Sequence, residues 1–258
     1  MESFSYLIMA FAKLMEVKKM DIGEIISDSI KYPSSNWGKV LILGVIMIAS
    51  ILIVPIFLLM GYLFRIIKAT LAGLDELPEF DEIGEMFVDG LKVFVVAIIY
   101  AIPVYIIALI IGALMGGTTT ATSLSINPYM IWAVVIGYIV YIIVAAIVGL
   151  IEVIAIANMA YYDGDLGAAF RFSEILEHIA RIGWGKYIAT YIVIAIVAFI
   201  GFLIGLLTLF ILIGIILLPL VIAPYIYMFG SRAIALLFIE AVSEEAQVTE
   251  IAEPEVAE

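Results

Sequence analysis

The feature that most constrains the fold is a series of apolar segments, each long enough to cross a lipid bilayer. Hydropathy places them at Val40 to Phe64, Val93 to Met115, Tyr129 to about Ala157, and Tyr187 to Ile239, and the last must hold two helices. A crossing takes about 20 apolar residues, and inside lipid only helices or closed barrels satisfy the backbone hydrogen bonds. The sequence therefore predicts an all-α, polytopic transmembrane helix bundle with five to six membrane segments.

The composition excludes the soluble classes of protein. Of the 258 residues, 66% are hydrophobic and 14% are charged, whereas soluble domains have roughly 45–50% apolar and about 25% charged residues. There is no cysteine and one histidine, His178, which argues against disulfides and a zinc site. No Lys/Arg cluster is present that could neutralise nucleic-acid phosphates. We expect no metal, cofactor or nucleic acid; the expected partners are membrane lipids and a homo-oligomer or larger membrane complex.

The two ends of the chain differ from the membrane domain, which we place at residues 20–240. Residues 240–258 hold seven of the 24 acids and no base, and so contribute much of the net charge of −12. Because such a segment has little apolar surface to bury, we expect residues 241–258 to form a disordered acidic tail. In residues 1–19, the apolar stretch from Phe4 to Leu14 is too short to cross. We interpret them as an interfacial helix or as an extension ahead of a translation start at Met20.

The charged connectors between the apolar segments repeat. IGEIISDSIK (Ile22 to Lys31) and IGEMFVDGLK (Ile83 to Lys92) align without gaps, a weaker copy follows Phe172, and NWGK at Asn36 is echoed by GWGK at Gly183. Their apolar positions recur at helical spacing, which predicts amphipathic helices that lie along the membrane interface or pack against the bundle. The predicted repeat units are residues 21–73, 80–160 and 170–240.

The number of crossings depends on the first apolar segment. If it crosses once, Lys and Arg divide almost evenly across the bilayer; if it turns back near Pro55, all of them fall on one side, as the positive-inside tendency favours. At about 1.5 Å per residue, the stretch from Trp37 to Gly73 spans slightly less than two crossings. We therefore favour a short or re-entrant hairpin, with the charged loops and the C-terminal tail in the cytoplasm.

Two blocks of sequence carry a resemblance to a known family. GYLFRIIKATLAGLDELPEFDEIGEMFVDGLK (Gly61 to Lys92) and DIGEIISDSIKYPSSNWGK (Asp21 to Lys39) resemble a family of polytopic membrane proteins common in methanogenic archaea, a domain of unknown function. The resemblance extends over roughly Met20 to Glu240 and implies a location in the archaeal cell membrane. The family has no assigned activity, so the resemblance gives no residue a role.

A few polar residues inside or beside the apolar segments are candidates for binding. Glu152, followed by Asn158, would be an intramembrane carboxylate, although it could also lie near a helix end where the interface solvates it. Arg65 and Lys68 share a helical face and could hold an anionic lipid headgroup, or serve as snorkelling anchors. Arg232 needs an acidic partner, for which Glu240 or Glu152 is the expected choice.

The connector LDELPEFDEIGE is unusually acidic. Its spacing is not that of a calcium-binding EF-hand loop, so we expect a solvated loop that faces a partner rather than a metal. The acidic residues assigned to this loop are Asp75, Glu76, Glu79, Asp81 and Glu82.

The sequence favours a non-catalytic function. It contains no Ser/His/Asp set, Gly-rich phosphate loop or H-E-x-x-H motif, so we expect no enzyme. A scaffold, assembly or lipid-interacting subunit accounts for the repeated connectors and the acidic loop. The alternative is a small-solute transporter or permease with a site near Glu152, built from repeats around the membrane midplane.

Overall fold

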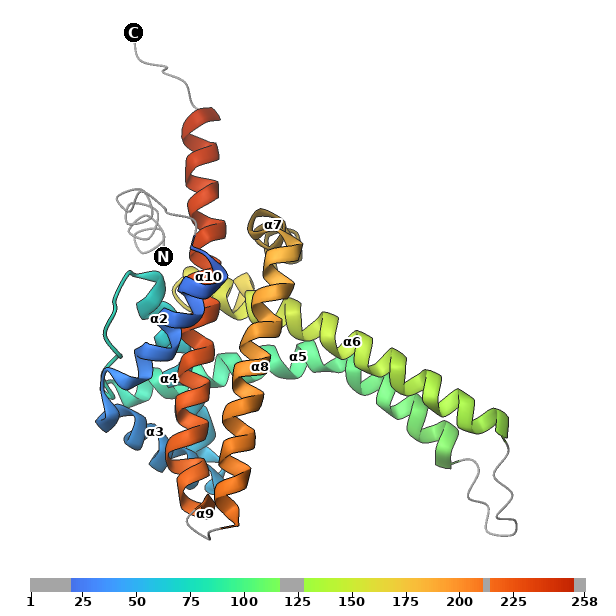
Figure 1. The fold of residues 1–258 in the computed structure, drawn as a ribbon. Helices are drawn as coiled ribbons and strands as arrows, with labels where there is room; N and C mark the ends of the chain where they lie inside the picture. The colour runs from blue at the N-terminus through green and yellow to red at the C-terminus, as the bar shows by residue number, and fades with distance from the viewer. Residues whose placement is uncertain (1–19, 117–127, 211–213, 253–258) are drawn as a thin grey trace.

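The computed structural model describes residues 20–116, 128–210 and 214–252, and these residues form helices and no strand (Figure 1). The helices are α2 (Ile22–Ser34), α3 (Trp37–Ala49), α4 (Val54–Leu71), α5 (Ile83–Gly116), α6 (Pro128–Tyr161), α7 (Phe172–Ile182), α8 (Trp184–Leu209), α9 (Gly214–Leu217) and α10 (Ala223–Ala252). Short 3-10 turns, η1 (Ser50–Leu52) and η2 (Leu166–Phe170), and a π-helical stretch, η3 (Leu218–Ile222), lie between them. The predicted polytopic helical bundle is confirmed. Five described helices are long and apolar enough to cross a membrane, or up to six if the bent pair α2 and α3 forms one span.

The predicted turn near Pro55 is present. Helix α3 ends at Ala49, and η1 and Ile53 connect it to α4. Ile53 has a φ of 69°, which is unusual for a β-branched residue and marks an abrupt change of chain direction. Pro55 lies in the first turn of α4, where the hydrogen bond that proline cannot donate is not needed.

The helices pair into three hairpins whose tips carry no charge. In the sequence, η1 joins α3 to α4, residues 117–127 join α5 to α6, and the stretch that contains α9 joins α8 to α10. The Lys and Arg residues of the described chain lie in α2, in α7, in the connectors or in parts of the hairpin helices away from the tips. Figure 1 shows α8 beside α10, and the α5–α6 hairpin extending sideways from the other helices. We call the charged end of the hairpins the charged face.

Helices α4 and α5 cross with their backbones in contact. A Cβ atom added at Gly61 would lie 1.8 Å from the carbonyl oxygen of Met86, and one added at Gly90 would lie 1.7 Å from that of Phe57. Small residues allow this close approach between membrane helices. The crossing fixes the two ends of the acidic connector that joins α4 to α5.

The three predicted repeat units differ in the form of their first helix. In the first, Pro33 lies in the last turn of α2, and Ser35 and the capping residue Asn36 separate α2 from α3, with a bend of 81°. In the third, Gly183, with a φ of 87°, separates α7 from α8. The second unit has no such break, because Lys92 leads directly into an apolar sequence, and its short predicted helix is the first part of α5.

The C-terminal end differs from the predicted disordered tail. Helix α10 continues to Ala252, and Ala241, Val242 and Ser243 are buried. We expected too little apolar surface at this end for it to be ordered, but its first turn has apolar side chains that pack on the bundle. Residues 1–19 and 253–258, which include the predicted N-terminal extension and the end of the tail, lie outside the described residues.

Candidate docking site on the charged face

Arg232 of α10 is the most buried base of the charged face. Its side chain is 4% exposed, and it donates hydrogen bonds from Nε to Asp28 Oδ1 at 2.9 Å and from Nη2 to Asp75 Oδ1 at 2.7 Å. Neither Glu240 nor Glu152, the expected partners, binds it. The prediction of an acidic partner was right, but its identity was wrong, because the partners come from α2 and from the connector after α4 rather than from neighbouring membrane segments.

Further contacts surround the Arg232 guanidinium. Nη1 donates to the carbonyl oxygen of Leu74 at 2.8 Å and to Thr70 Oγ1 at 3.3 Å, and the guanidinium carbon lies 4.7 Å from the centre of the Tyr32 ring. The planar fork of five N–H donors lets one guanidinium join several groups. Arg232 therefore ties α10 to α2, to the end of α4 and to the connector that follows.

The connector residues 74–82, which we call the acidic segment, are bound through their backbone. Side-chain donors from α2, α3, α4 and α10 reach their carbonyl oxygens. The pairs are Arg232 with Leu74, Tyr32 with Glu76, Lys39 with Leu77, Tyr62 with Pro78, and Arg65 with Asp81 and Glu82. Leu77 is buried, and Phe80 stacks on Tyr62 with ring centres 4.0 Å apart. The chain path of the acidic segment is therefore fixed by its neighbours.

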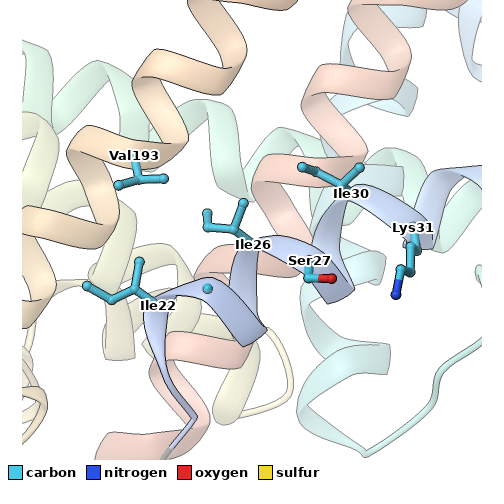
Figure 2. A pocket seen from close by; sticks show the side chains of 7 residues that line it. Ile22, Ile26, Ser27, Ile30, Lys31 and Val193 are labelled. Carbon is cyan, nitrogen blue, oxygen red and sulfur yellow. The ribbon is translucent and has the colours of Figure 1, made fainter.

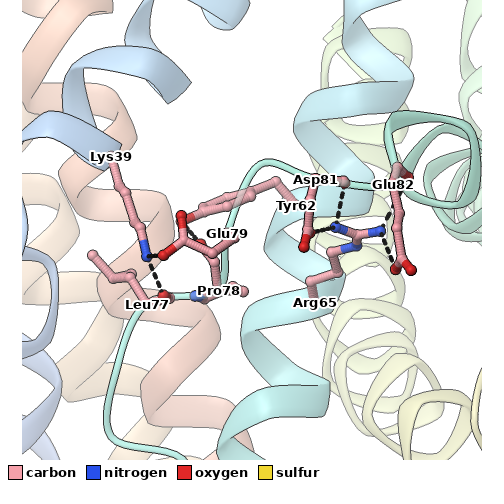
Figure 3. A network of polar contacts seen from close by, with 8 residues as sticks. All are labelled: Lys39, Tyr62, Arg65, Leu77, Pro78, Glu79, Asp81 and Glu82. Atoms are coloured by element: carbon pink, nitrogen blue, oxygen red, sulfur yellow. Dashed lines mark hydrogen bonds and ion pairs between the residues drawn. The ribbon is translucent and has the colours of Figure 1, made fainter.

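The carboxylates of the acidic segment pair with bases and still face solvent. Lys39 Nζ lies 2.7 Å from Glu79, and Arg65 lies 3.1 Å from Asp81 and 3.7 Å from Glu82 (Figure 3). The side chains of these three acids are 74%, 67% and 65% exposed, and that of Asp75 is 87% exposed. Each pair thus leaves carboxylate surface available at a defined position.

Arg65 and Lys68, predicted as a pair for an anionic headgroup, bind carboxylates of the chain itself. Arg65 contacts the acidic segment, and Lys68 Nζ lies 2.6 Å from Asp163 in the connector after α6. The two bases do not converge on one site. Their common role in the structure is to hold two connectors against α4.

Glu152 and Asn158 do not converge with Arg232. Asn158 is buried at the end of α6 and donates from Nδ2 to the carbonyl oxygen of Ala168 at 3.1 Å, which fixes the chain at η2. Glu152 is partly buried, and its carboxylate takes part in no hydrogen bond or ion pair among the described residues. The Glu152 carboxylate lies close enough to the Tyr100 hydroxyl of α5 to interact with it electrostatically.

A second group of polar side chains lies beside α7. Arg171 contacts Asp165 at 3.1 Å and lies 4.3 Å from the centre of the Tyr162 ring. Burial, followed by the neighbouring Glu174 carboxylate, raises the pKa of Tyr162. The buried His178 lies 3.8 Å from Glu174. Across the described part of the chain, no three His, Cys, Asp or Glu side chains are grouped so that they could hold a metal ion.

Sequence reasoning missed the residues that bind the acidic segment. Lys39, Tyr32 and Tyr62 stand in separate helices and share no motif. One signal was available for Asp28, since the repeat aligns it with Asp89. In the structure, Asp89 lies 3.5 Å from Lys92 of its own helix, whereas Asp28 binds Arg232.

In a comparison with protein families, residues 42–213 match a family described as Protein of unknown function (DUF4013). The chain belongs to the DUF4013 family. The matched range includes the α4–α5 crossing and the acidic segment, whereas α2 and α10 lie outside it. For this DUF4013 member, comparison with curated proteins and with solved structures found no match.

Proposed function

We propose that this protein is a non-catalytic scaffold of the membrane that presents the acidic segment to a basic partner. One observation carries the proposal: the backbone of the acidic segment is bound by side chains from four helices, while its carboxylates remain largely exposed. A loop that is already ordered loses little conformational entropy when it binds. Its negative charge would also steer a basic partner toward it.

The proposal includes a place in the cell. The charged face lies in the cytoplasm, because all described Lys and Arg residues are at that end and basic residues prefer the cytoplasmic side. Helices α2 and α7 lie along that membrane interface, and the membrane is the archaeal cell membrane that the sequence resemblance implies. The protein works as part of a homo-oligomer or a larger membrane complex, and the acidic segment supplies one contact surface.

Site-specific crosslinking tests the scaffold proposal. A photoreactive amino acid is placed at Glu76, which is exposed, in the native host, and crosslinked products are isolated from membranes. The double variant Glu85→Lys/Glu79→Lys reverses two exposed charges and should abolish the crosslink from position 76. A matched control, Glu255→Lys/Glu258→Lys, changes the net charge equally outside the described residues and should leave it intact.

The outcome of crosslinking decides between two functions. A defined protein that crosslinks at position 76, and is lost only with the charge reversal near the acidic segment, supports the scaffold. If no partner crosslinks at position 76, the scaffold proposal is wrong. The second candidate is then a small-solute transporter, which the unpaired Glu152 carboxylate in α6 favours. Solute-dependent thermal stabilisation that disappears in Glu152→Gln would support this alternative.

A further inference from the structure

An open apolar groove lies between α2 and α8, away from the acidic segment. It has a volume of about 400 Å³, and its lining residues are Ile22, Gly23, Ile26, Ser27, Ile30, Lys31 and Val193. Figure 2 shows the three isoleucines along one side of α2, in the direction of Val193, and Lys31 projecting from the other side. The groove therefore has an apolar floor along two helices and a basic residue at its edge.

Lys31 differs from the other bases of the described chain. Every other Lys and Arg in residues 20–116, 128–210 and 214–252 lies within ion-pair distance of a carboxylate. Lys31 takes part in no such pair among these residues, although Asp28 is one helical turn away. Asp28 instead binds Arg232. An exposed ammonium group is thus left at the edge of an apolar groove.

We propose that this groove binds a membrane phospholipid with an anionic headgroup. The acyl chain lies against Ile22, Ile26 and Val193 and continues along the exposed apolar surface of α8. The phosphate accepts hydrogen bonds from Lys31 Nζ and from the hydroxyl of Ser27, which is one helical turn before it. The proposal does not depend on the scaffold function, because the groove and the acidic segment share no residue.

Charge and shape together favour a lipid over other occupants. A soluble anion would gain nothing from the isoleucines, and an apolar peptide would leave the ammonium without a counter-ion. Basic residues at a membrane surface attract anionic lipids, and a lysine can keep its stem on apolar surface while its charge reaches the headgroup. A lipid with an acyl chain and a phosphate matches both parts of the groove.

Native mass spectrometry of the full chain measures the binding directly. The purified protein is titrated with phosphatidylglycerol or phosphatidylcholine that carry the same acyl chains. We expect Lys31→Gln to weaken phosphatidylglycerol binding about fivefold, as roughly 1 kcal/mol per basic residue implies, and Lys31→Arg to retain it. Phosphatidylcholine binding should change little in either variant. Because Lys31 is exposed, these variants should fold normally.

A second pair of variants tests the apolar part of the groove. Val193→Trp fills it and should weaken the binding of both lipids, whereas Ile196→Trp, at an exposed position of α8 outside the groove lining, should not. Equal phosphatidylglycerol affinity in wild type and Lys31→Gln, or equal effects of the two tryptophans, would overturn the proposal. So would lipid binding that occurs only after residues 1–19 are removed, because the chain's own N-terminal segment would then be the occupant.

Discussion

Replacement of Gly90 by alanine tests the α4–α5 crossing on which the acidic segment depends. The added Cβ would lie 1.7 Å from the carbonyl oxygen of Phe57, whereas ordinary contact begins at 3.4 Å. The two helices would therefore have to separate by about 1.7 Å at this point. Overpacking of this kind costs about 1–3 kcal/mol, and the separation also weakens dispersion contacts along the crossing. The better helix propensity of alanine, worth about 1 kcal/mol, offsets only part of this loss.

Thermal unfolding in detergent, followed by size-exclusion chromatography of the remaining folded protein, measures the effect. We expect Gly90→Ala to lower the melting temperature by several degrees, at roughly 2–4 °C per kcal/mol for a chain of this size. Gly84→Ala is the matched control, because it lies in the same helix and its Cβ would meet no atom within 4 Å. If Gly90→Ala melts at or above the temperature of the wild type, the close crossing inferred here is wrong.

Three further predictions concern the charged face. Arg232→Met should lower stability by about 1–3 kcal/mol, because buried hydrogen-bond partners such as Thr70 lose their donor; Arg232→Lys should recover only part of the loss, and chemical denaturation in detergent would measure both. Lys39→Ala should speed cleavage by a glutamate-specific protease within the acidic segment, since Leu77 and Glu79 lose a shared donor; an unchanged cleavage rate argues against an ordered segment. Burial raises the pKa of the Tyr162 phenol in the folded protein. As the pH rises, the phenol therefore loses its proton first in the unfolded chain, above pH about 10. The stability that the buried, neutral Tyr162 phenol contributes is complete below that pH and is lost as the pH rises through its pKa in the folded protein. Tyr162→Phe should therefore reduce the fall in melting temperature between pH 9 and 11.

The sequence was most informative where one property repeats along the chain. Apolar length predicted the helices, and the distribution of Lys and Arg, together with Pro55, predicted the turn between α3 and α4. The helices and this turn depend on residues that are near one another in the sequence and on lipid as the solvent, so the sequence alone indicates them. The break between α7 and α8, which was not predicted, lies at Gly183, whose positive φ glycine adopts without strain.

Contacts between distant segments could not be predicted in this way. Arg232 and Asp28 are 204 positions apart, and their pairing depends on how α10 packs against α2. Glu240 and Glu152, which are nearer to Arg232 in the sequence than Asp28 is, were therefore the better candidates from sequence alone. The close approach at Gly61 and Gly90 was missed for the same reason, because glycine in an apolar helix does not indicate which helix it meets.

The uncharged tips of the three hairpins have a consequence for how the protein enters the membrane. Moving an ionised side chain across the hydrocarbon core is costly, by about 2.5–3.5 kcal/mol for an Arg, Lys or Asp at the centre of a helix. The tips at η1, at residues 117–127 and near α9 contain no such side chain. With the charged face on the side on which the chain is made, as proposed above, each hairpin could be inserted as a unit from that side. The acidic segment and the other charged connectors would then stay on that side and form their ion pairs when the next hairpin arrives.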